Sequence, residues 1–366
     1  MRVAFVHDWL VTYRGGEKVL EALLSLYPEA PVYTLFYNPE AMPPAIRRRD
    51  VRYPRWTSTV RRGRKLLLPL MPRMVEALPL KDFDLIISTS SCVAKGVIKG
   101  PKARHLCYLH SPMRYIWDQQ EEYLAGVAHL PGAARAIRAL TPRLRRWDVE
   151  SAARVDRFVV NSSFVGERAR RFYGRDAVVI HPPIETERFV PRSPTNARLG
   201  YLLAAGALVS YKRFDLAIAA CEKLGRRLIV AGQGPMEAQL RRLAGSSTVF
   251  EIAPSDARFT ELLAGAEALL FPGVEDFGMI AVEAMASGTP VIAYKEGGAR
   301  DFIEPGRTGL YFDAPNADSL TAVLAAYDPA AFDAEILSRY AASYGRERFL
   351  ARIKAEIQTL LGEAAA

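Results

Sequence analysis

Short apolar runs rich in β-branched residues alternate with helix-like patterns along all 366 residues of the chain. Two of these runs, at 84–87 and 227–230, suit strands that are buried on both faces of a sheet. Repeated strand, helix, strand units form parallel sheets with right-handed crossovers. We therefore expect strands at 2–7, 31–36, 84–89, 104–109, 157–161 and 177–181, and again at 200–205, 227–231, 248–252, 268–271, 290–294 and 308–312.

The length of the chain predicts two domains, because one domain usually holds about 100–200 residues. A proline-rich stretch of low apolar content at 181–199 indicates a linker. We predict an α/β fold with two Rossmann-like, doubly wound parallel-sheet domains, at residues 1–185 and 186–344, that face each other across a cleft. An amphipathic helix within 345–366 is expected to pack back on the first domain.

The composition is that of an ordinary globular protein, and no run of about 18 apolar residues is present. The N-terminus turns polar too soon for a signal peptide and is typical of a first buried strand. Three cysteines without CxxC spacing favour small buried residues over a disulfide framework or a zinc site. We expect a cytoplasmic protein, with peripheral attachment to the inner face of the cell membrane as an alternative.

Basic residues gather in the first half of the chain. Residues 1–180 contain 30 Lys or Arg and 17 Asp or Glu, whereas the remainder contains 19 and 23. This asymmetry predicts an anionic partner for the first half: a membrane surface, a phosphorylated acceptor or nucleic acid. Nucleic acid is the weakest candidate, because no nucleic-acid-binding motif is present. Residues 61–74 and 131–147 mix arginines with apolar residues, and are either solvated helix faces or a patch that docks on anionic lipid.

Residues 271–290 carry the densest group of chemically informative side chains. A buried strand is expected to end before Gly273, and a helix to begin near Gly278. Glu275 then lies in the loop at the carboxyl end of the strand, and Glu283 lies about one turn into the helix. Free amides at the helix N-terminus favour an anion such as a phosphate. Taken alone, the two acids favour the structural alternative, in which Glu275 is a solvated loop residue and Glu283 an ordinary acid in the first turn of a helix.

Glu275 and Glu283, with seven residues between them in FPGxEDFG…EAMAxGTPVIA, resemble the E-x7-E signature of the GT4 glycosyltransferases, which are retaining enzymes of the GT-B fold. The resemblance extends over nearly the whole chain. It implies that Glu275 contacts the transferred sugar near the reacting centre and that Glu283 binds the nucleotide ribose. Amides of the intervening loop would hold sugar and phosphate, and in this sequence they belong to Phe277, Gly278, Met279 and Ile280.

The loop at 206–215 follows the first strand of the second half and opens a helix. Lys212 in this loop is well placed to neutralise a diphosphate, although a surface Lys–Arg pair is the alternative. The family has an arginine and a lysine five residues apart here. Lys212 matches the lysine, but Ala207 occupies the arginine position. Either Arg213 or another basic residue compensates, or charge stabilisation is weaker in this chain.

Two glycine-containing loops also follow strands. Gly15 and Gly16 would let backbone amides approach a phosphate closely, and a tight turn is an equally good account of them. The resemblance implies a glycine-rich loop at this point, near the donor phosphates and the acceptor. Gly232 ends a strand in the second half and is expected to border the nucleotide base.

His110 follows the strand at 104–109. A single histidine at a strand end is more often structural than catalytic, but the resemblance implies a histidine that reaches the sugar. We therefore expect His110 to position the sugar, beside Glu275 at the reacting centre. His7 and Asp8 follow the first strand and would lie at the same edge of the sheet.

Asp82 and Asp84 form a D-x-D triplet, which binds metal in another glycosyltransferase fold. Here the triplet starts a buried strand, the wrong end of the sheet for the site. We expect no catalytic metal and no cofactor, because the nucleotide sugar is a co-substrate.

The resemblance implies transfer of a hexosyl group from a nucleotide-sugar donor to a hydroxyl of a glycan or lipid-linked acceptor, with retention. The segments VHDWL…RGGEKVL, HSPMRYIWD and VxYKRxDLAI are similar to bacterial polysaccharide-assembly mannosyltransferases, which favours GDP-mannose as donor. UDP-linked sugars remain open. The alternatives are a nucleotide-sugar epimerase of the same architecture and a non-catalytic sugar-binding protein.

Overall fold

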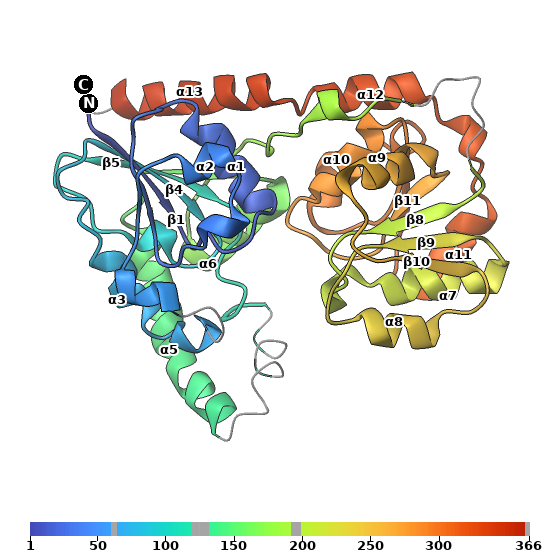
Figure 1. The fold of residues 1–366 in the computed structure, drawn as a ribbon, viewed down its shortest axis with the longest axis horizontal. Helices are drawn as coiled ribbons and strands as arrows, with labels where there is room; N and C mark the ends of the chain where they lie inside the picture. Colours follow the sequence, from blue (N-terminus) through green and yellow to red (C-terminus); the bar gives the residue numbers. More distant parts are fainter. Residues whose placement is uncertain (60–63, 119, 121–123, 125–131, 192–198, 363–366) are drawn as a thin grey trace. The chain divides into compact units, whose positions relative to one another are not determined.

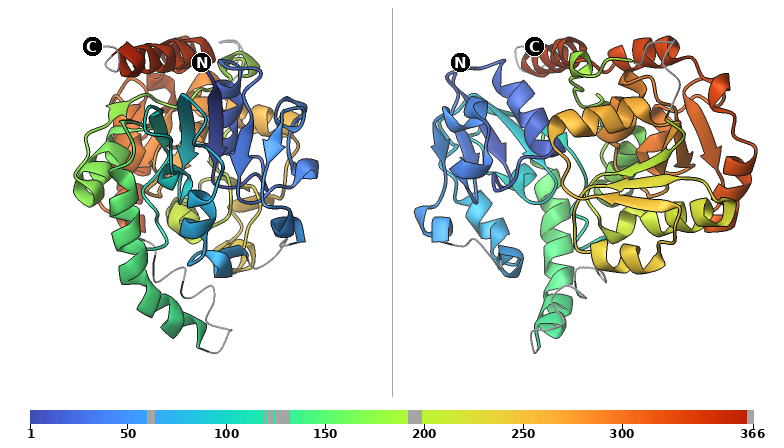
Figure 2. Two further views of the ribbon diagram at one scale, coloured as in Figure 1. Left: turned by 90° about the vertical axis from the view of Figure 1, so that its left-hand side faces the viewer. Right: turned by 45° about the vertical axis from the view of Figure 1, so that its right-hand side comes forward.

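The computed structural model describes the chain except for residues 60–63, 119, 121–123, 125–131, 192–198 and 363–366. The chain divides into two compact units (Figures 1 and 2). Unit 1 comprises Met1–His181 and Phe349–Ala366, and unit 2 comprises Pro182–Arg348. Parts of the two basic segments predicted at 61–74 and 131–147 lie outside the described residues.

Unit 1 is built, within the described residues, on a parallel sheet of seven strands in the order β3-β2-β1-β4-β5-β6-β7. The strands are β1 (Val3–His7), β2 (Val32–Thr34), β3 (Val51–Arg52), β4 (Leu85–Ser90), β5 (Arg104–Leu109), β6 (Arg157–Val160) and β7 (Val178–Val179). Every residue of β1 and β4 is buried, as expected for central strands covered on both faces. The sequence pattern does not predict β3, because this edge strand has two residues and one of them is exposed.

Helices cover both faces of this sheet (Figure 1). They are α1 (Gly15–Leu24), α2 (Pro44–Arg47), α3 (Met71–Glu76), α5 (Ala133–Ala152), α6 (Ser163–Tyr173) and α13 (Arg346–Gly362), with short 3-10 turns η1 (Pro39–Ala41), η2 (Arg55–Thr59), η3 (Arg64–Leu67) and η4 (Ala94–Gly96). Apolar residues of α1, α2 and α13 form one core layer, and Phe349 and Ile353 anchor α13 in it. Residues of α3, α5 and α6 pack on the opposite face.

Unit 2 repeats the plan with a parallel sheet of six strands, among the described residues, in the order β10-β9-β8-β11-β12-β13. The strands are β8 (Leu202–Ala205), β9 (Leu228–Ala231), β10 (Thr248–Glu251), β11 (Ala268–Phe271), β12 (Val291–Tyr294) and β13 (Gly309–Phe312). All of them lie where the sequence pattern predicts a strand.

The helices of unit 2 form two layers (Figure 1). They are α7 (Phe214–Leu224), α8 (Glu237–Leu243), α9 (Asp256–Gly265), α10 (Met279–Ala286), α11 (Ala317–Ala325) and α12 (Ala334–Ala342), with turns η5 (Thr186–Arg188), η6 (Ser210–Lys212), η7 (Gly297–Asp301) and η8 (Pro329–Ala331). One layer contains α7, α8 and α11, and the other contains α9, α10 and α12. Both units therefore have the doubly wound α/β architecture predicted from the sequence.

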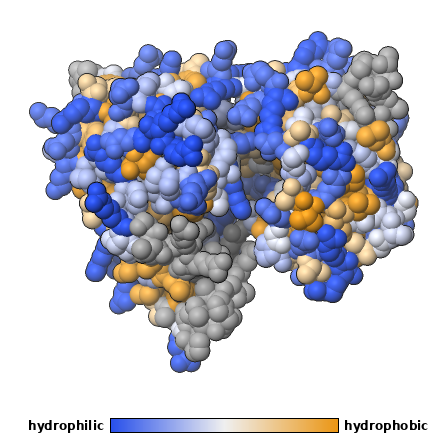
Figure 3. All heavy atoms as spheres, viewed as in Figure 1, coloured by the Kyte–Doolittle hydropathy of each residue, from blue (hydrophilic) through white to orange (hydrophobic). Residues whose placement is uncertain are grey.

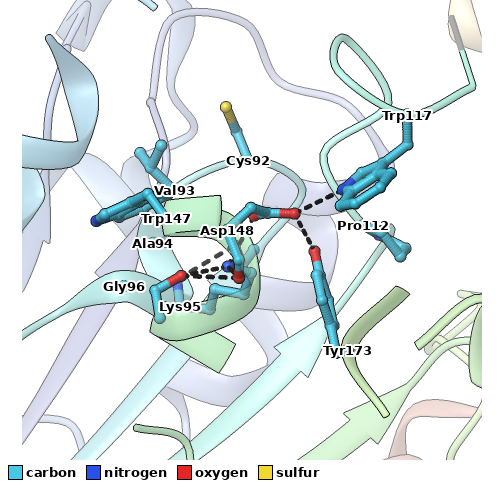
Figure 4. A network of polar contacts seen from close by, with 12 residues as sticks. Cys92, Val93, Ala94, Lys95, Gly96, Pro112, Trp117, Trp147, Asp148 and Tyr173 are labelled. Carbon is cyan, nitrogen blue, oxygen red and sulfur yellow. Dashed lines mark hydrogen bonds and ion pairs between the residues drawn. The ribbon is translucent and has the colours of Figure 1, made fainter. Parts of the chain in front are cut away.

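A buried ion pair organises the part of unit 1 that follows β5 (Figure 4). Lys95 and Asp148 are both fully buried, and the Lys95 Nζ lies 2.8 Å from Asp148 Oδ1. The same Nζ donates to the Ser151 hydroxyl, while Trp117 Nε1 and the Tyr173 hydroxyl each donate to Asp148 Oδ2 at 2.8 Å. The network thus joins η4, α5, α6 and the segment that leads away from His110.

Candidate active site

Each sheet has one position at which the order of its strands reverses. The order reverses between β1 and β4 in unit 1 and between β8 and β11 in unit 2. At such a switch point the connections leave toward opposite faces of the sheet, which opens a crevice outside the carboxyl ends of the strands. In unit 2 the loop after β8 contains Lys212, and the loop after β11 contains Glu275.

Lys212 and Glu275 form an ion pair at the switch point of unit 2, although 63 positions separate them in sequence. The Lys212 Nζ donates to Glu275 Oε1, and the two side chains are only 10% and 18% exposed. The ammonium also lies 6.0 Å from the centre of the Phe271 ring. The structure therefore brings together two side chains that the sequence analysis assigned to the diphosphate and to the sugar.

Close backbone packing at this edge requires glycine at Gly232. Its φ angle is +143°, and a Cβ atom there would lie 1.8 Å from the carbonyl oxygen of Gly206. Gly206 in turn is covered by the Lys212 side chain, whose Nζ would lie 3.1 Å from a Cβ at Gly206. Gly232 thus lets the loops after β8 and β9 meet beneath Lys212, at the place where the sequence analysis put the base.

The helix predicted between the two glutamates is α10. Gly278 is its N-cap residue with a φ angle of +97°, and a Cβ atom there would lie 2.4 Å from the Phe271 ring. The first amides of a helix have no partner within it, so those at Met279 and Ile280 are suited to bind an anion. Glu283 follows one turn later on the same helix.

A second glycine pair supports Glu275 and was missed by the sequence analysis. The Gly298 amide donates to the Glu275 carbonyl at 2.8 Å, and a Cβ at Gly298 would lie 2.4 Å from the Cα of Phe277. Gly297 and Gly298 follow β12, so they carry the same signal, a glycine pair after a strand, that singled out Gly15 and Gly16.

Arg213 is not directed to the loop at Ala207. It adopts a left-handed backbone conformation, with a φ angle of +52°, as the N-cap residue of α7. Its guanidinium binds the Asp215 carboxylate, with Nη2 3.0 Å from Oδ2. To compensate for the alanine at 207, Arg213 would first have to leave Asp215.

In unit 1 two histidines lie at the carboxyl edge of the sheet, one after β1 and one after β5. His7 ends β1, and its Nδ1 lies 2.6 Å from the hydroxyl of Thr89 near the end of β4. Its Nε2 faces Glu17 Oε1 at 3.7 Å. His110 follows β5, and a Cβ at Gly16 would lie 3.5 Å from His110 Nε2 and 3.8 Å from the His7 ring. The structure therefore places Gly16, His7 and His110 side by side.

His110 is partly exposed as a residue, but one of its ring nitrogens is buried. Its Nε2 is buried and has no hydrogen-bond partner within the described residues. Burial lowers the pKa of His110 to about 3, the charges of His7 and Arg114 act in the same direction, and Glu17 opposes them. The imidazole is therefore neutral near pH 7 and can exchange a hydrogen bond with a hydroxyl without carrying charge.

The glycine pair of unit 1 differs from a simple phosphate loop. Gly15 and Gly16 begin α1, but the amide of Arg14 donates to Glu17 Oε2 at 2.8 Å, so a carboxylate already caps this helix. Burial raises the pKa of Glu17, whereas its contacts with His7 and the Arg14 amide lower it, and the net pKa lies below the ordinary value. A negative charge is therefore present at the turn where the sequence analysis expected donor phosphates.

Asp8 has a structural task at the same edge. Its two carboxylate oxygens accept hydrogen bonds from four consecutive backbone amides, those of Ser91, Cys92, Val93 and Ala94. These bonds hold the loop after β4. All four amides donate to one buried carboxylate, so the hydrogen bonds of Asp8 stabilise this loop.

Asp84 lies at the amino end of β4, where its carboxylate accepts the Arg2 amide at 2.5 Å. Among the described residues, no group of three or more His, Cys, Asp or Glu side chains is arranged to hold a metal ion. In the same part of the chain, no helix is both long and apolar enough to traverse a bilayer.

Two family models match the chain. The model of Glycosyltransferase Family 4 matches residues 13–188, and the model of Glycosyl transferases group 1 matches residues 185–327. Two doubly wound units with these matches define the chain as a glycosyltransferase of the GT-B fold class. Within that class, it belongs to the GT4 family.

Curated relatives include a GDP-mannose-dependent alpha-(1-6)-phosphatidylinositol monomannoside mannosyltransferase from Mycolicibacterium smegmatis. It is 27% identical over 294 residues, which cover 72% of each chain. A D-inositol 3-phosphate glycosyltransferase from Streptomyces bingchenggensis is 30% identical over 193 residues, which cover 44% of this chain and 42% of the relative. The chain spans about half the length of several of the curated relatives it matches.

Solved structures agree on the fold over nearly the full length. HepE from Anabaena, in complex with UDP, has a TM-score of 0.71 at 16% identity, covering 98% of this chain and 100% of that one. Sucrose-phosphate synthase from Thermosynechococcus elongatus has a TM-score of 0.72 at 19% identity, covering 99% and 100%. At these identities the likeness establishes the fold alone.

Proposed function

We propose that the chain transfers a hexosyl group, mannose from GDP-mannose, to a hydroxyl of a glycan or lipid-linked acceptor with retention at the anomeric carbon. The observation that carries this proposal is the part-buried Lys212–Glu275 ion pair at the switch point of unit 2. A cation for the leaving diphosphate and an acid for the sugar lie in contact there, next to the N-terminus of α10.

Donor binding would separate this pair. A diphosphate offers Lys212 two negative groups in place of one carboxylate, and the first amides of α10 add donors that favour the same anion. Glu275, released from Lys212, is then free to accept hydrogen bonds from sugar hydroxyls. Glu283, on the same helix, would accept from the ribose diol. The ion pair thus keeps both charges compensated until the donor replaces it.

Unit 1 would contribute a neutral contact. The Nε2 of His110, which has no hydrogen-bond partner among the described residues, is suited to a sugar hydroxyl, because the low pKa of His110 keeps the ring uncharged. The Glu17 carboxylate beside Gly15 and Gly16 also favours hydroxyl groups over phosphate at that turn. We therefore place the diphosphate contacts of the proposed donor site in unit 2.

The retaining step would need no covalent enzyme intermediate. The bond between the anomeric carbon and the diphosphate breaks, the acceptor oxygen bonds to the same face of that carbon, and a phosphate oxygen takes the acceptor proton. Lys212 and the α10 amides would stabilise the charge that develops on the diphosphate. Removal of one such hydrogen-bond donor commonly lowers the rate of an enzyme by about 10²–10³-fold.

GDP-mannose is favoured as donor because two relatives are named as GDP-mannose-dependent mannosyltransferases, each 27% identical to this chain. A UDP-sugar is the second candidate, since solved structures of the same fold contain UDP or UDP-glucose. No cofactor or metal enters this proposal.

The acceptor would lie at an anionic membrane surface. Arg143 and Arg146 are exposed on α5, and Leu66 and Leu70 near α3 are 49% and 50% exposed. Figure 3 shows apolar surface beside charged surface in the part of unit 1 that carries α3. Exposed arginines next to apolar side chains are typical of a surface that lies on anionic lipid.

The test combines donor binding with transfer. Stabilisation of the chain against heat is measured with GDP-, UDP- and ADP-sugars, and the stabilising donor is then used in transfer assays. Glu275→Ala should lower transfer by at least about 100-fold with an unchanged circular dichroism spectrum. Glu335→Ala, an exposed acid on α12, is the matched control and should keep full activity. Full transfer by Glu275→Ala, or isomerisation of the donor without transfer, would refute the proposal.

A further inference from the structure

Unit 1 contains a cavity of about 540 Å³ beside its edge strand β3, and none of the candidate active-site residues lines it. Its volume falls within the range of about 300–1,000 Å³ that is usual for small-molecule sites. The cavity is lined by Tyr33, Arg52, Tyr53, Pro54, Trp56, Arg73, Met74, Ala77, Leu78 and Pro79. Two of these, Arg73 and Met74, end the basic, apolar segment 61–74, and the proposed transfer reaction uses neither side chain.

Aromatic rings form one side of this cavity. Trp56, on η2, is 54% exposed, and Tyr53 precedes it on the same segment. Tyr53 is held by an edge contact with Tyr37, whose ring centre lies 5.4 Å away. Tyr33, on β2, is buried behind them and packs edge-on against Phe83. Aromatic faces at a solvent-accessible cavity are surfaces on which the apolar face of a pyranose ring can stack.

The two arginines of the lining differ in their charge balance. Arg52 is compensated by Asp50, with Nη2 2.7 Å from Oδ2, and also donates to the Tyr33 hydroxyl at 2.8 Å. Arg73 is exposed on α3 and has no acidic partner within the described residues. Among the described residues that line it, the cavity therefore presents one uncompensated guanidinium next to aromatic faces and no carboxylate.

We propose that this cavity is a second carbohydrate site, which binds an acidic sugar residue of a glycan: a pyranose ring that carries a carboxylate. The ring would stack on Trp56 and Tyr53, and the carboxylate would pair with the fork of Arg73. One carboxylate balances the single uncompensated arginine, whereas a doubly charged phosphate would leave excess negative charge. An acyl chain would leave the Arg73 guanidinium without an acceptor in an apolar contact.

The site does not depend on the donor chemistry of unit 2, which allows a separate test. Ligand-observed NMR with glucuronate and, as a matched neutral probe, glucose measures binding to the full chain. Glucuronate is expected to bind and glucose to bind at least about tenfold more weakly, because it lacks the charged partner of Arg73. Binding should persist in Lys212→Ala, which removes the cation of the proposed donor site.

Two variants locate the binding. Arg73→Ala and Trp56→Ala should each weaken glucuronate binding by about tenfold or more, and Arg73→Lys should restore it only in part, since lysine lacks the bidentate fork. Arg48→Ala, an exposed arginine of unit 1 outside the cavity, is the matched control and should bind normally. The proposal fails if glucuronate does not bind or if Arg73→Ala binds it normally. Decanoate tests an acyl chain as the occupant: the proposal also fails if decanoate binds and only Trp56→Ala abolishes that binding.

Discussion

At the scale of single residues, the candidate site combines ionisable groups whose charge is set by their surroundings. Lys212 and Glu275 are enclosed together, so the charge of each is compensated by the other. His110 has a strongly lowered pKa and a buried ring nitrogen that meets no hydrogen-bond partner in the described part of the chain. The sequence identifies all three positions as strand ends, but only the fold shows which of them touch.

His110 should make unit 1 less stable in mild acid. The pKa of His110 is about 3 in the folded protein, whereas an ordinary histidine in the unfolded chain has a pKa of about 6.5. As the pH falls below about 6.5, the unfolded chain therefore binds a proton that the folded protein does not bind, and the free energy of unfolding decreases. Between pH 7 and pH 5 this loss is about 2 kcal/mol for one such group. His110→Asn should reduce the decline in the free energy of unfolding by that amount.

Unfolding in urea, followed by tryptophan fluorescence at pH 7, 6 and 5, measures this decline. All four tryptophans lie in unit 1, so the signal reports this unit alone. His105, whose pKa burial also lowers to about 3, remains in both proteins and its contribution cancels in the comparison. Equal declines in wild type and His110→Asn would show that His110 is not held neutral by burial.

At the scale of helices and strands, the sequence predicts most of the fold. Every expected strand is present, because strands buried on both faces leave long apolar runs that periodicity can detect. Edge strand β3 is the exception, since two partly exposed residues leave no such pattern. Individual polar contacts could not be predicted, including the ion pair of Arg213 with Asp215 and the backbone hydrogen bond from Gly298 to Glu275, because they depend on how loops pack.

The Lys95–Asp148 pair is another such contact, and its loss should be costly. Lys95→Met leaves Asp148 charged and buried, which commonly destabilises a protein by about 3–5 kcal/mol. Lys95→Met/Asp148→Asn should recover part of that loss, because the asparagine keeps an acceptor for Trp117 or Tyr173 without a charge. The free energy of unfolding of unit 1, again from tryptophan fluorescence in urea, is the measurement.

Arg170 and Asp176 supply the matched control for this pair. They are also ion-paired in unit 1, but their side chains are 71% and 84% exposed, so Arg170→Ala should change stability little. If Lys95→Met were as mild as Arg170→Ala, the buried network would not be what holds η4, α5 and the segment after His110 together.

At the scale of the whole molecule, charge separates the two units. The excess of basic residues falls entirely in unit 1, because residues 349–366, which return to it, contain as many basic as acidic residues. A field of this kind attracts anionic surfaces and is weakened by salt. An acceptor presented at a membrane would therefore meet unit 1 first, and this expectation has a direct test.

The chain should sediment with vesicles that contain phosphatidylglycerol and not with neutral phosphatidylcholine vesicles. Binding should fall steeply between about 50 mM and 500 mM NaCl, because the screening length drops from about 14 Å to about 4 Å. Arg143→Glu/Arg146→Glu reverses two exposed charges on α5 and should weaken binding by about tenfold or more, since each basic residue near the surface contributes about 1 kcal/mol. Arg242→Glu/Arg348→Glu makes the same change in net charge at exposed sites of unit 2, so normal binding by this control would assign the effect to α5. If both variants lost vesicle binding equally, the interaction would depend on net charge alone and not on α5. Vesicle binding that does not change with salt would contradict an electrostatic contact with the membrane.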